Sequence, residues 1–361
     1  MAAKSFSFSD FPVLQVTPGI NITGVSWAGD CSCFYLPELG MMIDAGIYTN
    51  LTPHIILITH GHADHIKALP NAFWELGQVR PIVILPKAIK DKAIAYIESL
   101  FAMSQGFNKY HDKITFVGLG PDDDPFECIV KGRHLKIMPI KCRHSVPCLG
   151  YGIIEVRNKL KTEYEHLKTN GKQLDLLKES GITIHEEVEF PLFAHLGDTD
   201  NKVFKDQADK LKLFKRIHIE CSFIIEDAIK CAKKTKHMAW PWLEDYIKYN
   251  NDTQFMIFHI SHRYGLERIH EFFADKRKQY PNVIPFVQKL GTNRVNTSLR
   301  TIGTCTSENN VSIIKTTHIK ATTGVQSKGM SNDPKVVDIL SQLLTESKIQ
   351  TGLLTDLIKK D

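Results

Sequence analysis

Short apolar runs alternate with longer amphipathic stretches between about Val13 and Gln288. Apolar runs of about four to eight residues fit buried strands, and apolar positions three and four residues apart fit helices that cover a sheet. The predicted strands are Ile55–Ile58, Ile82–Leu85, Ile114–Val117, Leu135–Ile140, Val188–Ala194, Ile217–Ile219 and Phe255–Phe258. The predicted helices are Lys87–Met103, Glu226–Lys234, Trp240–Tyr249 and Leu266–Lys276. This alternation predicts layered α/β structure within one domain, residues 1–304.

The pattern changes after Thr304. Residues 305–333 are rich in Ser, Thr, Gly, Asn and Lys with little apolar periodicity, which predicts a linker. Residues 334–361 begin with a proline and repeat apolar residues at helical spacing, which predicts an added amphipathic helix. We expect this helix to dock on the parent domain or on a second subunit.

The composition is that of a globular protein, with 43% hydrophobic and 24% charged residues. A net charge of +5 permits a polyanionic partner without requiring one. No signal peptide and no apolar run of membrane-spanning length is evident, so we expect a cytoplasmic or nuclear protein without a membrane partner. The eight cysteines form no C-x-x-C pair and suit reduced thiols. Cys31 and Cys33 precede the apolar run Phe34–Leu36, so we interpret them as strand residues and not as metal ligands.

The most informative segment is Thr59-His60-Gly61-His62-Ala63-Asp64-His65, directly after a predicted strand. His60 and His62 lie two residues apart in an extended turn and can converge on one cation. Asp64 and His65, at the start of the next helix, can reach a second cation nearby. The segment therefore predicts two half-sites for metal ions.

Further ligands are expected where other predicted strands end. His144, Asp198 and His259 each follow an apolar run, and strand ends cluster at one edge of a sheet. The chain has 16 histidines, so isolated ones need no functional role. We interpret four of them as surface or satisfied core residues: His111, His166, His185 and His195.

These motifs resemble the metallo-β-lactamase superfamily and, within it, the tRNase Z (ribonuclease Z) family, most closely its short plant-type members. The resemblance covers roughly Val13 to Gln288 and includes Thr59–His65, His144–Tyr151, Gly197–Thr199, Glu220–Phe223, Lys236–Met238 and His259–Tyr264. It implies an αββα sandwich, two face-to-face sheets with helices outside, and an endonuclease that removes 3′ trailers from precursor tRNA. A homodimer is also implied.

The resemblance assigns His60, His62 and His144 to one zinc ion, Asp64, His65 and His259 to another, and Asp198 to both. Nitrogen and oxygen donors suit zinc and do not exclude manganese or iron. Two such cations lower the pKa of a water toward neutrality and clamp a phosphate, so the implied reaction is hydrolysis of RNA by a metal-activated hydroxide. Asp64 would also orient that hydroxide. The catalytic roles implied for the remaining motifs are a proton donor, His237, and a supporting carboxylate, Glu220.

Two residues are candidates for substrate binding, Arg263 and Thr199. The Arg263 guanidinium suits a phosphate, although a surface salt bridge explains it equally well. Thr199 would order the loop around Asp198 or bond to a metal-ligand carboxylate. The chain departs from the family at Glu220-Cys-Ser-Phe, usually Glu-Ala-Thr-Phe, and at Lys236-His-Met-Ala, which lacks the usual Ser-Thr pair. Both departures lie in the motifs that contain Glu220 and His237.

The Gly-Pro-rich arm that many tRNase Z enzymes use to grip tRNA has no counterpart in the sequence. Residues 155–189 form a charged insert that we expect to be helix-prone and to guide RNA backbone or form a solvated face. Two other functions stay open. One is a hydrolase of the same fold for a small acyl substrate, such as a β-lactam or a thioester; the other is a non-catalytic RNA-binding protein that keeps its metals for stability.

Overall fold

The structure is a computed structural model that describes residues 11–73, 79–106 and 113–288 of the 361-residue chain. The chain divides into two compact units, Met1–Cys305 and Thr306–Asp361, and all described residues belong to the first. The predicted linker 305–333, the predicted helix 334–361 and His111 lie outside the described residues.

The first half of the domain forms a seven-stranded mixed sheet in the order β1 to β7. Its first four strands pair antiparallel, and the pairs from β4 to β7 are parallel. The strands are β1 (Val13–Thr17), β2 (Ile20–Trp27), β3 (Cys31–Leu36), β4 (Met41–Ile43), β5 (Ile55–Leu57), β6 (Ile82–Pro86) and β7 (Thr115–Leu119).

The second half repeats this plan with a seven-stranded sheet in the order β14 to β8. Strands β8 to β11 pair antiparallel, and the pairs from β11 to β14 are parallel. The strands are β8 (Phe126–Val130), β9 (Arg133–Cys142), β10 (Cys148–Leu160), β11 (His185–His195), β12 (Arg216–Glu220), β13 (Gln254–Phe258) and β14 (Val283–Pro285).

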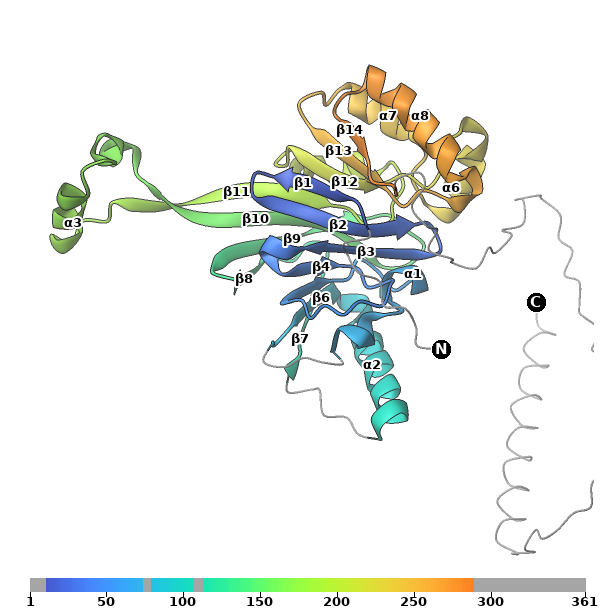
Figure 1. Ribbon diagram of the computed structural model, residues 1–361, viewed down its shortest axis with the longest axis horizontal. Coiled ribbons are helices and arrows are strands. Elements are labelled where there is room, and N and C mark those ends of the chain that lie inside the picture. Colours follow the sequence, from blue (N-terminus) through green and yellow to red (C-terminus); the bar gives the residue numbers. More distant parts are fainter. Residues whose placement is uncertain (1–10, 74–78, 107–112, 289–361) are drawn as a thin grey trace, which may run out of the picture. The chain divides into compact units, whose positions relative to one another are not determined.

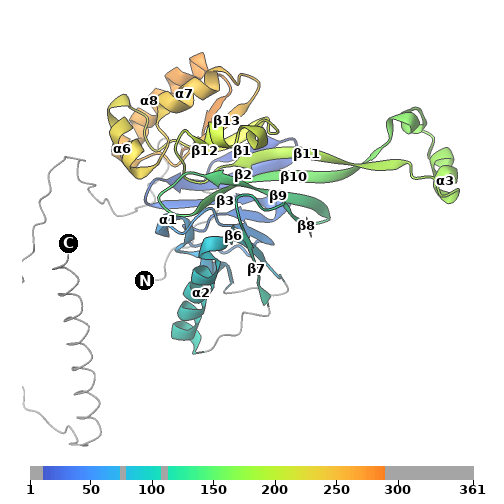
Figure 2. The ribbon, with the colours of Figure 1, turned by 180° about the vertical axis from the view of Figure 1, so that it is seen from behind.

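Alternating side chains divide the core into layers. In β5, Ile55 and Leu57 belong to a cluster that joins residues of both sheets, whereas Ile56 belongs to a cluster that includes the covering helices. This period of two places one face of each strand between the sheets and the other under helices. Figures 1 and 2 show α2 outside the first sheet and α7 and α8 outside the second. The predicted αββα sandwich is therefore confirmed.

The helices cover the outer faces and connect the parallel strands. They are α1 (Ala63–Ile66), α2 (Lys90–Gln105), α3 (Gly171–Glu179), α4 (Val203–Asp206), α5 (Ala208–Leu211), α6 (Ile229–Thr235), α7 (Trp240–Lys248) and α8 (Leu266–Gln279). Short 3₁₀ turns are η2 (Pro37–Leu39), η3 (Leu69–Phe73), η4 (Lys87–Ile89), η6 (Thr162–Leu167), η7 (Glu226–Ala228) and η8 (His262–Tyr264). All four predicted helices and all seven predicted strands are present. Among the described helices, none combines the length and the apolar character needed to span a membrane.

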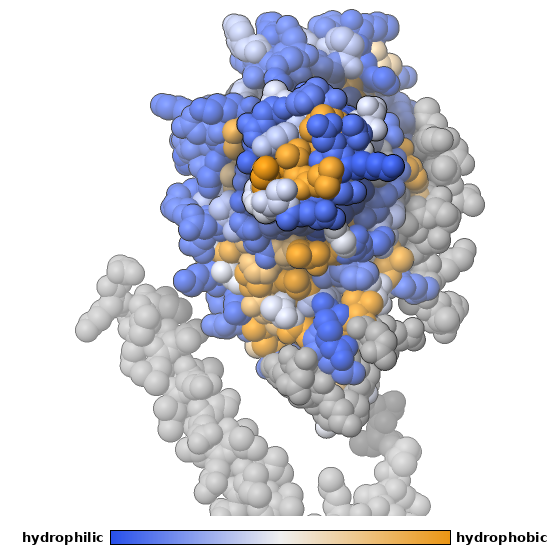
Figure 3. Space-filling model, turned by 90° about the vertical axis from the view of Figure 1, so that its left-hand side faces the viewer, coloured by the Kyte–Doolittle hydropathy of each residue, from blue (hydrophilic) through white to orange (hydrophobic). Residues whose placement is uncertain are grey.

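The prediction of a helix-prone insert at 155–189 is wrong for both of its ends. Residues 155–160 continue β10 and residues 185–189 belong to β11, with Leu160 paired to His185. Only η6 and α3 at the tip are helical. The two strands form a long hairpin that extends away from the sandwich and carries α3 at its end (Figure 1). The tip is hydrophilic around a small apolar patch (Figure 3). In α3, Leu176 is exposed.

Candidate metal centre

Loops at one edge of the two sheets bring the predicted ligands together. The segment that begins with His60 follows β5, and His144 follows β9. Asp198 follows β11, and His259 follows β13. Tyr151 in β10 ties the two sheets at this edge, because its hydroxyl donates a 2.7 Å hydrogen bond to the carbonyl of Ile58. The end of a strand in the packed sandwich therefore positions each of these ligands.

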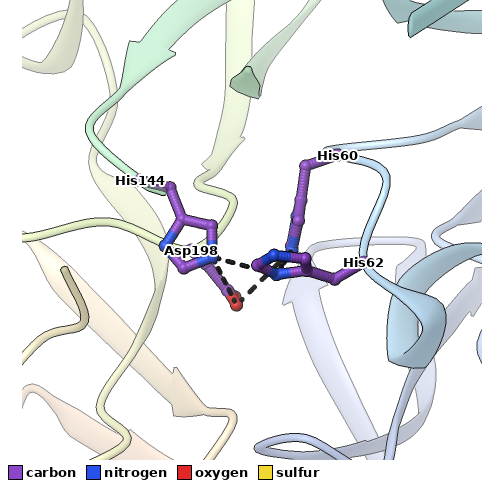
Figure 4. A group of neighbouring side chains, drawn as sticks. All are labelled: His60, His62, His144 and Asp198. Carbon is purple, nitrogen blue, oxygen red and sulfur yellow. Dashed lines mark hydrogen bonds and ion pairs between the residues drawn. The ribbon is translucent and has the colours of Figure 1, made fainter. Parts of the chain in front are cut away.

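The first group contains His60, His62, His144 and Asp198 (Figure 4). The His62 Nδ1 atom lies 3.1 Å from Nε2 of His60 and 3.1 Å from Nε2 of His144. Asp198 Oδ2 lies 3.7 Å from Nε2 of His60 and 3.8 Å from Nε2 of His144. Zinc–nitrogen bonds of about 2.0–2.1 Å separate tetrahedral ligand atoms by roughly 3.3 Å, so the three nitrogens have the spacing of ligands to one ion.

The second group contains Asp64, His65 and His259, and it meets the first at Asp198. Asp198 Oδ2 lies 3.2 Å from Nε2 of His259 and 3.6 Å from Nε2 of His65. Asp64 Oδ2 lies 3.5 Å from Nε2 of His65 and 3.9 Å from Nε2 of His259. One buried carboxylate oxygen therefore faces imidazoles of both groups, which is the geometry of a bridging ligand.

Three buried atoms at this meeting point have no hydrogen-bond partner among the described residues: His65 Nε2, His259 Nε2 and Asp198 Oδ1. Buried polar atoms are normally paired, and an unpaired one is costly. Burial also lowers the pKa of His60 and of His144, so both rings stay neutral near pH 7 and keep a lone pair. Burial lowers the pKa of His65, but the charges of Asp198 and Asp44 raise it more, so this ring would release a proton on binding a cation. The neutral rings of His60 and His144, the carboxylates and the unpaired atoms converge in a buried space and fit divalent cations.

Side chains behind the ligands fix which ring nitrogen faces the centre. Asp44, which sequence reasoning did not identify, hydrogen-bonds His65 Nδ1 at 2.7 Å and also accepts hydrogen bonds from Thr59. Ser26 and Ser32, also not identified, lie 3.3 and 3.1 Å from His259 Nδ1. A partner on the outer nitrogen orients the ring and leaves the inner nitrogen for a metal ion. Asp44 directly follows the apolar residues Met41–Ile43, so it obeys the rule of a strand followed by a polar residue, but a run of three residues is too short to be recognised in the sequence.

The backbone at the site is unusual. The described residues with a positive φ that are not glycine are Asp44 (58°), Lys131 (50°), Lys236 (56°) and His259 (58°), and all but Lys131 belong to this site. Left-handed conformations of such residues cost free energy and cluster where the fold imposes a functional geometry. Gly197 has a different reason to be glycine, because an added Cβ would lie 2.6 Å from Cys148 Sγ. The chain needs that close approach to position Asp198.

His237 lies beside the two groups and is held by Glu220. Glu220 Oε1 lies 2.7 Å from His237 Nδ1 and accepts a hydrogen bond from the Thr199 amide. Burial lowers the pKa of His237, but the charge of Glu220, its hydrogen bond and the charge of Asp198 raise it more, to about 9. The imidazole is therefore protonated near neutral pH and can donate a proton. Its side chain is 17% exposed, so it can reach a substrate.

The two sequence departures near His237 preserve this arrangement. Ser222, which replaces the usual threonine, donates a 2.8 Å hydrogen bond to Glu220 Oε2. Cys221 and Met238 are fully buried and contribute to the core. The Lys236 carbonyl accepts a 3.1 Å hydrogen bond from His144 Nδ1 and so links the His237 loop to a candidate metal ligand.

Thr199 and Arg263 differ in access to a substrate. Thr199 is fully buried, and its hydroxyl accepts a hydrogen bond from the Arg143 amide and donates one to the Asp200 carbonyl. These contacts fit its predicted role in the loop that carries Asp198, and its contact with substrate stays a prediction. Arg263 is exposed, donates to Ser261 Oγ at 3.1 Å and lies over the Phe223 ring. It forms no ion pair with any described carboxylate, so the salt-bridge interpretation is wrong.

Five described residues that were predicted to be structural belong to none of the described metal-binding groups: His166, His185, His195, Cys31 and Cys33. His166 and His185 are exposed, as predicted. His195 is buried and stacks on Phe258, but neither of its ring nitrogens has a hydrogen-bond partner among the described residues, so it is a core residue without being satisfied. Cys31 and Cys33 are buried free thiols in β3 and belong to no described metal-binding group, in agreement with their interpretation as strand residues.

Comparisons with known proteins identify relatives of this chain. No family model matches the chain. The chain is 28% identical to tRNase Z TRZ2, chloroplastic, of Arabidopsis thaliana over 276 residues, which are 74% of this chain and 75% of that protein. It is 30% identical to the nuclear ribonuclease Z of Triticum aestivum over 182 residues, which are 49% of this chain and 97% of that protein.

Among solved structures, human tRNase Z, short form, is similar with a TM-score of 0.43 and 17% identity, over 67% of this chain and 92% of that chain. The family assignment rests on the relatives that were identified by sequence identity. The chain belongs to the ribonuclease Z family, hydrolytic nucleases of the metallo-β-lactamase fold.

Proposed function

We propose that this protein is a zinc-dependent endoribonuclease that removes 3′ trailers from precursor tRNA. The observation that carries the proposal is the buried centre in which Asp198 Oδ2 faces the imidazoles of both ligand groups. The family relationship supports the nuclease activity. The names of the relatives, tRNase Z and ribonuclease Z, support a tRNA substrate.

Seven residues would hold two zinc ions. His60, His62 and His144 would bind one, Asp64, His65 and His259 the other, and Asp198 both. Bound divalent cations supply Lewis acidity, which polarises a phosphodiester and lowers the pKa of water toward neutrality. The nitrogen and oxygen donors fit zinc and also accept manganese or iron.

Asp64 has a second role beyond holding a cation. Burial raises the pKa of its carboxyl, but the hydrogen bond and the charge of His65 lower it more, so the group is ionised at neutral pH. Its Oδ2 also accepts a 3.0 Å hydrogen bond from the Gly29 amide. A fixed carboxylate at this position can accept a hydrogen bond from the attacking water and orient it.

His237 would protonate the leaving oxygen. Glu220 holds Nδ1, so the ring presents Nε2 on its opposite side. The water would add its oxygen to phosphorus and release one proton to solvent as the phosphorus–oxygen bond to the ribose breaks. The proton on Nε2 would pass to the departing ribose oxygen, and His237 would regain a proton from solvent. Glu220 stabilises the protonated form of His237, because a neighbouring carboxylate favours the imidazolium. Arg263, exposed beside this position, would contact a phosphate.

We also propose a subunit state and a compartment. A homodimer is the state that the family resemblance implies, and sedimentation of the purified chain tests it. The seven described cysteines are free thiols, which favours the reducing cytosol or nucleus. Fluorescence microscopy of the tagged protein tests the compartment.

The test of the proposed function is incubation of the zinc-loaded protein with an end-labelled precursor tRNA, beside Asp64→Ala and a chromogenic β-lactam. A single metal-dependent cut at the 3′ end, absent in Asp64→Ala, is the expected result. Hydrolysis of the lactam without RNA cleavage would make the protein a small-substrate hydrolase. Binding of RNA without any turnover would make it a non-catalytic RNA-binding protein.

A further inference from the structure

His262 presents an aromatic ring to solvent beside the candidate metal centre. The ring stacks on the indole of Trp27, with the ring centroids 4.4 Å apart and the ring planes 17° from parallel. Trp27 is 8% exposed, whereas the side chain of His262 is 41% exposed. Among the residues that the structure describes, no second ring packs on His262. Trp27 therefore covers one face of the imidazole, and the exposed surface of the ring lies on the side away from Trp27.

The position of this ring is fixed before any ligand binds. His262 Nε2 donates a 3.2 Å hydrogen bond to Asp30 Oδ2. The chain on either side is also held, because Trp27 forms a parallel bridge with Ile260 and the Ala28 amide donates a 3.2 Å hydrogen bond to the Ile260 carbonyl. A ring that is already ordered loses little conformational entropy when a ligand packs on it, which favours binding.

The same contacts connect His262 to the candidate metal centre. Asp30 follows Gly29, whose amide donates a 3.0 Å hydrogen bond to Oδ2 of the candidate ligand Asp64. His262 also lies in the turn η8, which follows the candidate ligand His259 and contains Arg263. The exposed ring is therefore next to the place where a phosphodiester would be cut.

Another histidine on the surface pairs with an acid but lacks these features. His134 Nε2 lies 2.8 Å from Glu127 Oε2, and its ring packs on no aromatic ring among the described residues. His134 is near the start of β9, at the end of that strand remote from His144. An ion pair alone therefore does not require an aromatic neighbour, and the stack on Trp27 beside the metal centre distinguishes His262.

Unpaired RNA bases bind to exposed rings of this kind. Single-stranded RNA is recognised largely by side chains on which its splayed bases stack, and histidine is one of these side chains. A base placed on the outer face of His262 would continue the stack that Trp27 begins, and it would lose contact of its flat apolar face with water. Arg263, the next residue, would hold a backbone phosphate, so the turn η8 would contact a base and a phosphate of the same strand.

We infer that the imidazole of His262, backed by Trp27, stacks on an unpaired base of the RNA next to the scissile bond. The inference rests on the proposed function for the identity of the substrate, and it identifies a residue that positions the strand at the metal centre. Every base has a π face, so the stack contributes affinity and position without selecting a base sequence. His262 is thus a positioning residue and takes no part in proton transfer.

The test separates the ring of His262 from its hydrogen bond in the full-length, zinc-loaded protein. His262→Gln removes the ring but keeps a donor for Asp30, whereas His262→Phe keeps a ring and removes the donor. His134→Gln is the matched control. The measurements are zinc content, kcat/KM on precursor tRNA and the Kd for the precursor, the last in a His237→Ala background that cuts slowly. The kcat/KM and Kd measurements are repeated with two precursors, each of which lacks the base of one of the nucleotides that flank the cut.

Loss of one stack between a base and an aromatic ring weakens binding by roughly 5- to 100-fold. We expect this loss in both kcat/KM and Kd for His262→Gln, with unchanged zinc content, and values within about 3-fold of wild type for His262→Phe and His134→Gln. The loss should disappear on one of the two abasic precursors, because the base that stacks is then absent. Wild-type values for His262→Gln, an equal loss for His262→Phe, or a loss that persists on both abasic precursors overturns the inference.

The same experiment separates this inference from the proposed function. Binding of the precursor that depends on the His262 ring, without any cleavage by the wild type, contradicts the nuclease proposal alone. Cleavage by the wild type that His262→Gln leaves unchanged contradicts the inference alone. Absence of both binding and cleavage in the wild type contradicts both.

Discussion

The candidate metal centre and the tip of the β10–β11 hairpin lie at the two ends of the same strands, but they are stabilised in different ways. At the edge, each imidazole has a defined partner on its outer nitrogen, and several ligands are almost fully buried. In the hairpin, the residues from Arg157 to Lys159 are exposed, and surface ion pairs such as Lys159–Glu165 accompany them. Surface ion pairs contribute little free energy, whereas buried ligands tolerate few changes. Substitutions at the edge should therefore alter function strongly, and changes to the hairpin tip should alter it weakly.

The largest effect is expected for Asp198→Ala. This change removes the oxygen that faces both ligand groups and leaves their imidazoles without a shared partner. We expect both metal ions to be lost and RNA cleavage to fall by at least ~10⁴-fold. Metal analysis and initial rates measure the two effects. Asp200→Ala is the matched control, because Asp200 lies two residues further on, pairs with Arg143 and should keep wild-type metal content.

A smaller effect is expected for His237→Ala. A positioned general acid contributes about 10²- to 10⁴-fold, so cleavage should slow by that factor while metal content stays at the wild-type level. Glu220→Gln should act in the same direction through His237. Single-turnover rates and metal analysis are the measurements. Loss of metal from His237→Ala would show that this residue is a ligand and not the acid.

Asp44→Asn tests whether residues behind the ligands matter. The substitution keeps the size of the side chain but removes the negative charge that holds His65 Nδ1. Outer partners of this kind contribute about 10- to 100-fold in metal affinity, so zinc affinity should fall by that factor. Competition with a chromogenic chelator measures the affinity. Unchanged affinity would mean that Thr59 and the packing alone orient His65.

The smallest effect is expected when the hairpin tip is shortened. Leu160 pairs with His185, so an Asn-Gly turn can replace residues 161–184 without changing the register. Zinc content should be unchanged, and cleavage of precursor tRNA should stay within about 3-fold of wild type, because His144 and Asp198 lie at the ends of β10 and β11 that are remote from the tip. A loss of cleavage of 10-fold or more would make the hairpin part of the substrate-binding surface.

The contrast between the two regions also explains what the sequence could predict. Ligands after buried strands were recognisable because Ile55–Ile58 and Phe255–Phe258 are apolar runs followed at once by His60 and His259. Asp44 obeys the same rule, but its strand of only three residues is too short to stand out. Ser26 and Ser32 support His259 from β2 and β3, more than 220 residues away in the chain. Only the folded structure brings such distant residues together.

The sequence of the hairpin predicted the wrong secondary structure for a different reason. Residues 155–160 are mixed in charge and lack apolar alternation, so they do not resemble a buried strand. Their extended conformation comes from pairing with residues 185–190 across the hairpin. Strand pairing of this kind overrides local preference, which is why β-strand propensity depends on context.

The central claim is that the edge of the sandwich binds two divalent cations that share Asp198. Crystals of zinc-reconstituted protein, measured at the zinc absorption edge, test it most directly. The account predicts two anomalous peaks about 3.5–4 Å apart, one beside His60, His62 and His144 and the other beside Asp64, His65 and His259, with Asp198 in contact with both. A single peak, or two peaks without Asp198 between them, would contradict it.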